Sequence, residues 1–246
     1  MQPTAILSAL AQEQSGLIEL LHGPRKVTHA GRDFWQGDLH GQPVVLALSR
    51  IGKVAAATTA AALIERFGVQ RMVFTGVAGG LGTGISVGDV VVGESFVQHD
   101  MDASPLFPRY EVPLYGQTLF CCDAALTSTL FEASQNALSN PHLQRAYPAA
   151  RVHLGLIASG DRFVSGAGQS STLRNALRSV GHDVLAVEME GAAVAQTCHD
   201  YGIPFAAVRT ISDRADDTAH VDFPGFIDQV ASKYALAIVE RFLMAL

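Results

Sequence analysis

Three acidic residues from distant parts of the chain each follow a segment predicted to be a strand. Glu13 comes soon after the first apolar segment, and Glu190 and Asp213 each follow a later one. Ligands of open α/β sheets bind at the carboxyl ends of strands, so these carboxylates could meet around one substrate. Helix capping or solvent exposure would explain each acid taken singly. The functional interpretation therefore depends on all three together.

Short apolar segments alternate with longer helical segments along most of the chain. Strands are predicted at residues 4–10, 43–49, 72–75, 89–94, 152–159, 185–188 and 205–211. Helices are predicted at residues 54–67, 123–138, 170–180, 190–201 and 224–246. Several strands are almost continuous apolar runs, as a strand covered on both faces requires. The alternation predicts an α/β fold, with a central mixed β-sheet flanked by helices, in a single domain over residues 1–246.

Local signals predict some of the boundaries. Gly68 stands where a glycine would end the first predicted helix, at residues 54–67, and Asp123 and Ser170 are plausible N-caps. Residues 101–116, with three prolines, are predicted to form a long loop. Such a loop is often a binding element, and a surface excursion without function is the alternative.

A glycine cluster follows the predicted strand at 72–75. Its members are Gly76, Gly79, Gly80, Gly82 and Gly84, and their spacing matches neither a dinucleotide-binding nor a P-loop pattern. Two interpretations remain, which are close approach of the backbone to a flat ligand and tight internal packing.

No metal or other cofactor is expected. The nine histidines include no H-E-x-x-H pair, and the segment His99-Asp100-Met101-Asp102 has the spacing of no common metal site. Ser159 lies in no G-x-S-x-G pattern, which argues against a serine hydrolase of that type.

Composition narrows the partners and the compartment. The net charge is -6 and Lys and Arg form no block, so a nucleic-acid partner is not expected. Three cysteines, two of them adjacent, provide no disulfide framework and favour a reducing compartment. The first ten residues lack a basic region, and the longest apolar-rich stretch, residues 54–64, is about half the span of a bilayer. We expect a cytoplasmic protein with no membrane partner.

Eight segments together resemble a known family. They are ILSAL (6–10), SRIGKVAAA (49–57), TGVAGG (75–80), VGDVVV (87–92), HDMD (99–102), SGDRF (159–163), VEME (187–190) and VRTISD (208–213). In this order and spacing, the chain resembles the 5′-methylthioadenosine/S-adenosylhomocysteine nucleosidases of the purine nucleoside phosphorylase and uridine phosphorylase superfamily. The resemblance implies a nucleoside phosphorylase-like α/β domain and a homodimer. It also implies a hydrolase that cleaves the N-glycosidic bond of an adenine nucleoside with water.

The resemblance assigns roles to the three acids. Asp213 is implied to be the general acid that protonates the leaving adenine, and burial could keep its proton near neutral pH. Glu13 is implied to orient and deprotonate the attacking water, and Glu190 to accept hydrogen bonds from the ribose hydroxyls. The transition state resembles an oxocarbenium ion, as in glycosidases that use an acid and a base carboxylate.

Further substrate-binding residues are also implied. Phe163 is expected to stack on adenine, with the backbone of Val164 at the edge of the base. Met189 is expected against the ribose, and Ile51 and Phe223 around the 5′-alkylthio group. Ordinary core packing is the alternative for Met189, Ile51 and Phe223.

Other positions concern the interface and departures from the family pattern. Ala103 and Leu106 match residues that the family contributes across the dimer interface. Arg209 could hold a catalytic carboxylate in place or pair with surface acids. Val77 stands where the family usually has a hydroxyl beside the substrate. Arg50 replaces a usual glycine and could bind phosphate, bind the carboxylate of S-adenosylhomocysteine or face solvent.

Two alternatives to this function stay open. One is a related phosphorylase, or a hydrolase of another 6-aminopurine nucleoside such as 5′-deoxyadenosine or aminofutalosine. The other is a non-catalytic nucleoside-binding protein. The presence of Glu13 favours water as the nucleophile, because a phosphorylase needs anion-binding arginines rather than a base.

Overall fold

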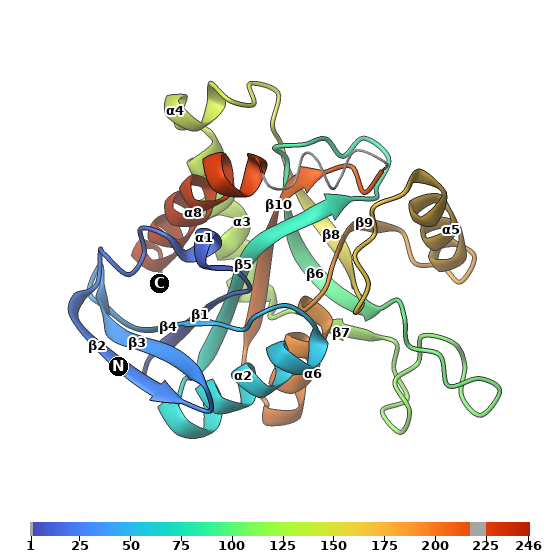
Figure 1. Ribbon diagram of the computed structural model, residues 1–246, viewed down its shortest axis with the longest axis horizontal. Helices are drawn as coiled ribbons and strands as arrows, with labels where there is room; N and C mark the ends of the chain where they lie inside the picture. The colour runs from blue at the N-terminus through green and yellow to red at the C-terminus, as the bar shows by residue number, and fades with distance from the viewer. Residues whose placement is uncertain (1, 217–224) are drawn as a thin grey trace.

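The computed structural model describes residues 2–216 and 225–246 and contains a ten-stranded sheet with helices on both sides (Figure 1). The strands are β1 (Thr4–Ser8), β2 (His22–His29), β3 (Arg32–Leu39), β4 (Gln42–Leu48), β5 (Arg71–Gly80), β6 (Val90–Gln98), β7 (Leu119–Cys121), β8 (Val152–Ser159), β9 (Val184–Glu188) and β10 (Phe205–Asp213). The helices are α1 (Ala11–Gln14), α2 (Lys53–Phe67), α3 (Ala124–Leu138), α4 (Pro141–Gln144), α5 (Ala167–Arg178), α6 (Gly191–Tyr201), the π-helix η1 (Ile227–Ala231) and α8 (Ser232–Met244). Parallel and antiparallel pairs both occur, which confirms the predicted α/β fold with a mixed sheet.

Five of the strands close into a ring. β10 pairs with β6, β6 with β8, β8 with β9, β9 with β5, and β5 with β10. β1, β4, β3 and β2 continue the sheet outward from β5. β1, β5 and β10 are parallel neighbours, so their carboxyl ends lie at one edge. β9 pairs with the last two residues of β5, Gly79 and Gly80. This pairing brings the end of β9 to the same edge.

Most predicted strands are confirmed, and β8 has the predicted bounds. The predicted end of β5 at residue 75 is wrong, because this strand continues through the glycine cluster to Gly80. Glycine is a weak strand former, but β10 pairs with this stretch, with Arg209 opposite Gly76 and Ile211 opposite Ala78. Pairing with a neighbouring strand therefore overrides the local preference.

The predicted helices are also present, with one wrong start. Gly68 ends α2 in the left-handed conformation, with a φ of 62°, and the Asp123 side chain accepts from Leu126 N at the start of α3. Ser170 is not an N-cap, because α5 begins three residues earlier, after Gly166. The Ser170 hydroxyl lies within the helix and donates to the Gly166 carbonyl oxygen at 3.2 Å.

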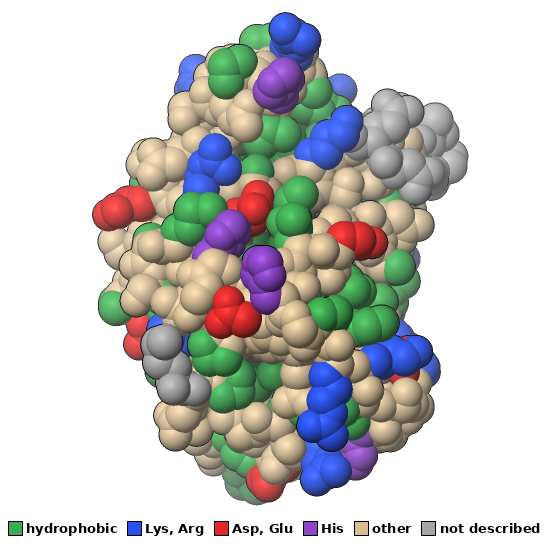
Figure 2. Space-filling model, turned by 90° about the vertical axis from the view of Figure 1, so that its left-hand side faces the viewer, with side chains coloured by type: hydrophobic (Ala, Val, Ile, Leu, Met, Phe, Trp, Pro, Cys, Tyr) green, Lys and Arg blue, Asp and Glu red, His purple; other side chains and the backbone are tan. Residues whose placement is uncertain are grey.

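The sequence analysis does not predict the hairpin of β2 and β3. Most of β2 is exposed, so it lacks the apolar alternation that predicts a strand. The available signal is the two-residue turn Ala30-Gly31, in which both residues have positive φ values of 47° and 70°. On the face where β2 and β3 lie, basic and acidic side chains are interspersed (Figure 2).

Two helical layers cover the sheet. α2 and α6 share one hydrophobic cluster, to which Leu63 and Val194 contribute. α3 and α8 share a second cluster, to which Leu130 and Phe242 contribute. The helix predicted at 224–246 is observed over the described residues 225–244, which include η1 and α8. None of the helices in the described part of the chain is long and apolar enough to cross a membrane.

The predicted irregular segment at residues 101–116 contains no helix or strand. It belongs to the chain that extends away from the body between β6 and β7 (Figure 1). Leu106 and Leu114 on this segment are 84% and 91% exposed. The segment therefore presents large apolar side chains to solvent.

Candidate active site

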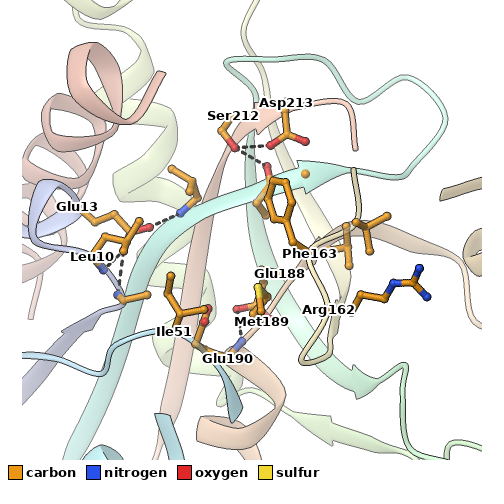
Figure 3. Close-up of a pocket in the computed structure, with 16 residues that line it drawn as sticks. Leu10, Glu13, Ile51, Arg162, Phe163, Glu188, Met189, Glu190, Ser212 and Asp213 are labelled. Carbon is orange, nitrogen blue, oxygen red and sulfur yellow. Dashed lines mark hydrogen bonds between the residues drawn. The ribbon is translucent and has the colours of Figure 1, made fainter. Parts of the chain in front are cut away.

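A cavity of about 480 Å³ opens at the edge where β1, β5, β9 and β10 end (Figure 3). Glu13, Glu190 and Asp213 all line it, although they are separated by up to 200 positions in the chain. Each carboxylate is nearly inaccessible, with 3%, 6% and 2% of the residue surface exposed. Three buried acids around one cavity are costly unless they are used, which identifies a candidate active site.

Glu13 is held by three backbone amides. The short helix α1 follows β1 and directs the side chain back over the sheet, where Oε2 accepts from the amides of Ala9 and Leu10, each at 2.8 Å. Oε1 accepts from the amide of Val77 at 3.1 Å. Burial raises the pKa of Glu13, although these amides and the charge of Arg209 act in the opposite direction. The carboxylate is thus fixed in orientation and made more basic.

Asp213 is the last residue of β10 and is held at both oxygens. The Ser212 hydroxyl donates to Oδ2 and the Ala215 amide donates to Oδ1, each at 2.8 Å. The side chain points into the cavity beside Phe163 (Figure 3). One hydrogen bond to each oxygen fixes the orientation of the Asp213 carboxyl group in the cavity.

Two glycines of β5 make room for these carboxylates. A Cβ on Gly76 would lie 2.9 Å from Glu13 Oε1, and a Cβ on Gly79 would lie 3.0 Å from Asp213 Oδ1. Both distances are shorter than a van der Waals contact. Gly76 and Gly79 therefore allow close approach to the backbone, and the approaching groups are the protein's own acids.

Glu190 occupies the N-cap position of α6. Its Oε1 accepts from the amide of Gly52 at 2.7 Å, a contact between the start of α2 and the start of α6. Burial is the main cause that raises the pKa of Glu190 to about 8, and the neighbouring charge of Glu188 adds to it. The free site therefore holds this group close to its titration point at neutral pH.

A fourth acid, Glu188, also lines the cavity and was not among the predicted site residues. It forms an ion pair with Arg209 at 2.8 Å, with side chains 3% and 1% exposed. Its carboxylate also accepts from the Ser159 hydroxyl and from the amides of Glu190 and Gly191. The available signal was the sequence Val-Glu-Met-Glu, which places two acids at the end of one apolar strand.

The observed partner of Arg209 is therefore neither a predicted catalytic carboxylate nor a surface acid. Arg209 does not pair with surface acids, because Glu188 is buried, and its partner is not one of the three predicted carboxylates. It does not line the cavity. Its guanidinium also donates to the carbonyl oxygens of Phe74 and Val208, each at 3.0 Å, and lies 4.1 Å from the centre of the Phe74 ring. The pairing of Arg209 with Glu188 depends on the fact that β9 and β10 both pair with β5, which the sequence does not display.

Most of the remaining predicted binding residues lie around the cavity. Ile51, Val77, Phe163, Val164 and Met189 line it. Ile51 is 55% exposed and Phe163 is 44% exposed, so ordinary core packing does not describe Ile51.

Two predicted residues lie elsewhere, and so does Arg50. Ala103 and Leu106 do not line the cavity of their own chain. Phe223 lies outside the described residues. The Arg50 guanidinium donates to the carbonyl oxygen of Gly31 at 2.6 Å, on the β2–β3 turn, and does not reach the cavity. Its backbone φ of 67° explains why glycine suits this position.

The residues described around the cavity include no cluster of metal ligands. In the described ranges, His, Cys, Asp and Glu side chains nowhere gather in threes with the geometry of a metal site. The described residues that line the cavity offer carboxylates, the Ser212 hydroxyl, the Arg162 guanidinium, backbone amides and apolar walls.

Comparisons with known proteins agree with this arrangement. The sequence pattern of the phosphorylase superfamily matches residues 3–244. The chain is 34% identical over 236 residues to a 5′-methylthioadenosine/S-adenosylhomocysteine nucleosidase of Shewanella denitrificans, a match covering 95% of this chain and 96% of that one. The fold is similar to the crystal structure of the nucleosidase from Neisseria meningitidis in complex with methylthio-immucillin-A, with a TM-score of 0.87, 36% identity and full coverage of both chains. It is also similar to a futalosine hydrolase mutant of Helicobacter pylori, with a TM-score of 0.86, 29% identity and full coverage of both chains.

Proposed function

Because the chain belongs to the 5′-methylthioadenosine/S-adenosylhomocysteine nucleosidases of the phosphorylase superfamily, we propose how its three buried carboxylates carry out the hydrolysis. The protein is an N-glycosyl hydrolase that binds adenine nucleosides and releases adenine from methylthioadenosine and S-adenosylhomocysteine. The observation that carries the mechanism is the single cavity of about 480 Å³ that Glu13, Glu190 and Asp213 share.

Asp213 is the general acid. As the bond between ribose and adenine breaks, negative charge develops on the base, and a proton delivered to N7 neutralises it. The Ser212 hydroxyl and the Ala215 amide, each 2.8 Å from one carboxyl oxygen, support this role because they fix the direction of the proton. Phe163 stacks on the base, and the backbone of Val164 meets its edge.

Glu13 orients the attacking water and accepts its proton. Three amide hydrogen bonds hold the carboxylate still, which places a base at a fixed distance from the anomeric carbon. Burial raises its pKa and so improves proton acceptance. A base of this kind serves water and is not needed for phosphate.

Glu190 binds the ribose hydroxyls. One ionised carboxylate can accept two alcohol donors, and the Gly52 amide leaves Oε2 available for them. Met189 lies against the sugar and Ile51 against the 5′-alkylthio group. Val77 presents an apolar side chain where the family usually has a hydroxyl, so one polar contact worth about 1 kcal/mol is missing.

The distribution of cations supports water rather than phosphate as the nucleophile. Arg162 is the one basic residue among the described residues that line the cavity. Arg209 is bound to Glu188, and Arg50 is bound to the carbonyl oxygen of Gly31. A phosphorylase needs several cations around its anion.

An assay of adenine release tests the proposal. We expect equal rates with and without phosphate, and an absolute requirement for phosphate would overturn hydrolysis. The substrate panel includes 5′-deoxyadenosine and aminofutalosine, because the futalosine hydrolase mutant of Helicobacter pylori shares this fold. We expect Asp213→Asn to lower kcat at least roughly 100-fold while the protein stays folded. Asp183→Asn, on an exposed ion pair with Arg178, is the matched control. Absence of turnover with every adenine nucleoside would favour the binding protein.

We further propose that two copies of the chain form a homodimer. The exposure of Leu106 and Leu114 on the extended segment supports this, because a partner would bury them. Ala103 and Leu106 of the partner subunit would then close the 5′-alkylthio end of the cavity. Light scattering should give a dimer mass, which Leu106→Asp lowers and the control Val180→Asp leaves unchanged. A monomeric wild type would refute the assembly.

A cytoplasmic location is also proposed. The thiols of Cys121, Cys122 and Cys198 are all free, which suits a reducing compartment. Fractionation of cells that express the tagged protein measures its location.

A further inference from the structure

Two chain segments on opposite sides of the cavity are joined directly to each other. One is the turn before α2, which contributes Ile51 to the cavity and the Gly52 amide to Glu190. The other follows β8 and contributes Phe163. Figure 3 shows Ile51 and Glu190 close together below the cavity, with Phe163 on the opposite wall.

A closed ring of hydrogen bonds makes this junction. The Lys53 amide donates to Asp161 Oδ1 at 2.7 Å, and the Asp161 amide donates to Asp100 Oδ2 at 2.9 Å. Lys53 Nζ completes the ring by donating to Asp100 Oδ1 at 2.6 Å, and it also donates to Gln98 Oε1 at 3.1 Å. The ring therefore ties together the start of α2, the end of β6 and the segment after β8.

Asp161 has a specific place in this ring. The N-cap of α2 is Gly52, which has no side chain to accept from the first free amides of the helix. Asp161 supplies that acceptor from a distant segment, and its negative charge also suits the amino end of a helix. A Cβ on Gly52 would lie 3.1 Å from Asp161 Oδ1, so the two groups are already in close contact.

We propose that Asp161 is a positioning residue for Glu190. By holding the Lys53 amide, Asp161 fixes the peptide before it, and this keeps the Gly52 amide 2.7 Å from Glu190 Oε1. Asp100 and Lys53 brace Asp161 in turn. The effect of Asp161 on substrate binding rests on the proposed function, in which Glu190 binds the ribose hydroxyls as a carboxylate.

The groups that face Glu190 determine how it responds. Glu188 on β9 and Glu13 on α1 disfavour its ionised form, while Arg209 on β10 and the Gly52 amide favour it. Loss of the Gly52 hydrogen bond therefore raises the pKa of Glu190 further and leaves less carboxylate at neutral pH. A residue that only capped α2 would lower stability without this effect.

The experiment follows the carboxyl ¹³C shift of Glu190 against pH in the full-length protein. We expect its titration midpoint to rise by about half a unit or more in Asp161→Ala, and by less in Asp161→Asn, which keeps an acceptor oxygen. Asp183→Ala, at an exposed ion pair with Arg178, is the matched control. In the same variants, we expect the KM for methylthioadenosine to rise about threefold to tenfold, with a smaller change in kcat.

The two proposals fail separately. An unchanged Glu190 midpoint in folded Asp161→Ala would overturn the positioning role, whatever the activity of the wild type. If the midpoint rises but the wild type releases no adenine, the positioning of Glu190 stands and the proposed function falls.

Discussion

Gly76→Ala tests whether the position of Glu13 controls catalysis. The added Cβ would lie 2.9 Å from Glu13 Oε1, and a relaxed contact needs about 3.5 Å, so the carboxylate has to move by about 0.6 Å. This movement stretches the 3.1 Å bond from the Val77 amide, a bond to a charged group worth about 1.5–3 kcal/mol. Because a misplacement of about 1 Å can lower a rate 100-fold, we expect kcat to fall roughly 10- to 100-fold.

The assay is adenine release at saturating methylthioadenosine, with urea unfolding to show that the variant is folded. Gly168→Ala is the matched control, since a Cβ there meets nothing within 4 Å and the backbone is not left-handed. In a Glu13→Gln background, the added methyl group should cost little further activity, because the group that it displaces no longer acts as a base. A folded Gly76→Ala enzyme with kcat within about threefold of wild type would refute the reasoning.

Three further predictions concern pH, backbone strain and the buried ion pair. Folded Glu190, with its pKa raised from 4.5 to about 8, keeps a proton that the unfolded chain releases, so its contribution to stability falls as pH rises across that range. Glu190→Gln should remove this fall, as urea unfolding of variant and wild type at several pH values would show. Arg50→Gly should be about 1 kcal/mol more stable to urea than Arg50→Ala, because both lose the guanidinium and only glycine relieves the φ of 67°. Glu188→Gln should lower the unfolding free energy by about 3 kcal/mol, since it leaves the Arg209 charge buried and unpaired. A loss below about 1 kcal/mol would contradict this last expectation.

Local sequence signals were sufficient where burial follows a simple period. The apolar run of β8 predicts that strand with its observed bounds, and Gly68 and Asp123 mark helix ends because their side chains suit those positions. The same local signals do not predict the hairpin of β2 and β3. β2 is largely exposed and β3 is mostly half-buried, so neither strand shows an alternation of buried and exposed residues.

Contacts between remote segments were the main source of error. The end of β5 was placed too early because glycine disfavours a strand, whereas pairing with β10 extends it to Gly80. Arg209 was expected to meet a catalytic or a surface acid, and it pairs with Glu188 instead. Arg50 lies next to Ile51 in the sequence, but its left-handed backbone sends the guanidinium to the Gly31 carbonyl oxygen.

The sequence alone determined the α/β alternation, the family resemblance and the three acids at strand ends. These follow from residue type and short-range spacing, which record how each segment is buried. Only the tertiary structure decided that Gly76 and Gly79 receive the carboxylates of Glu13 and Asp213, and that the Gly52 amide reaches Glu190. The physical reason is that sheet register and the closure of the strand ring set distances between remote backbone atoms, and no local pattern of side chains encodes those distances.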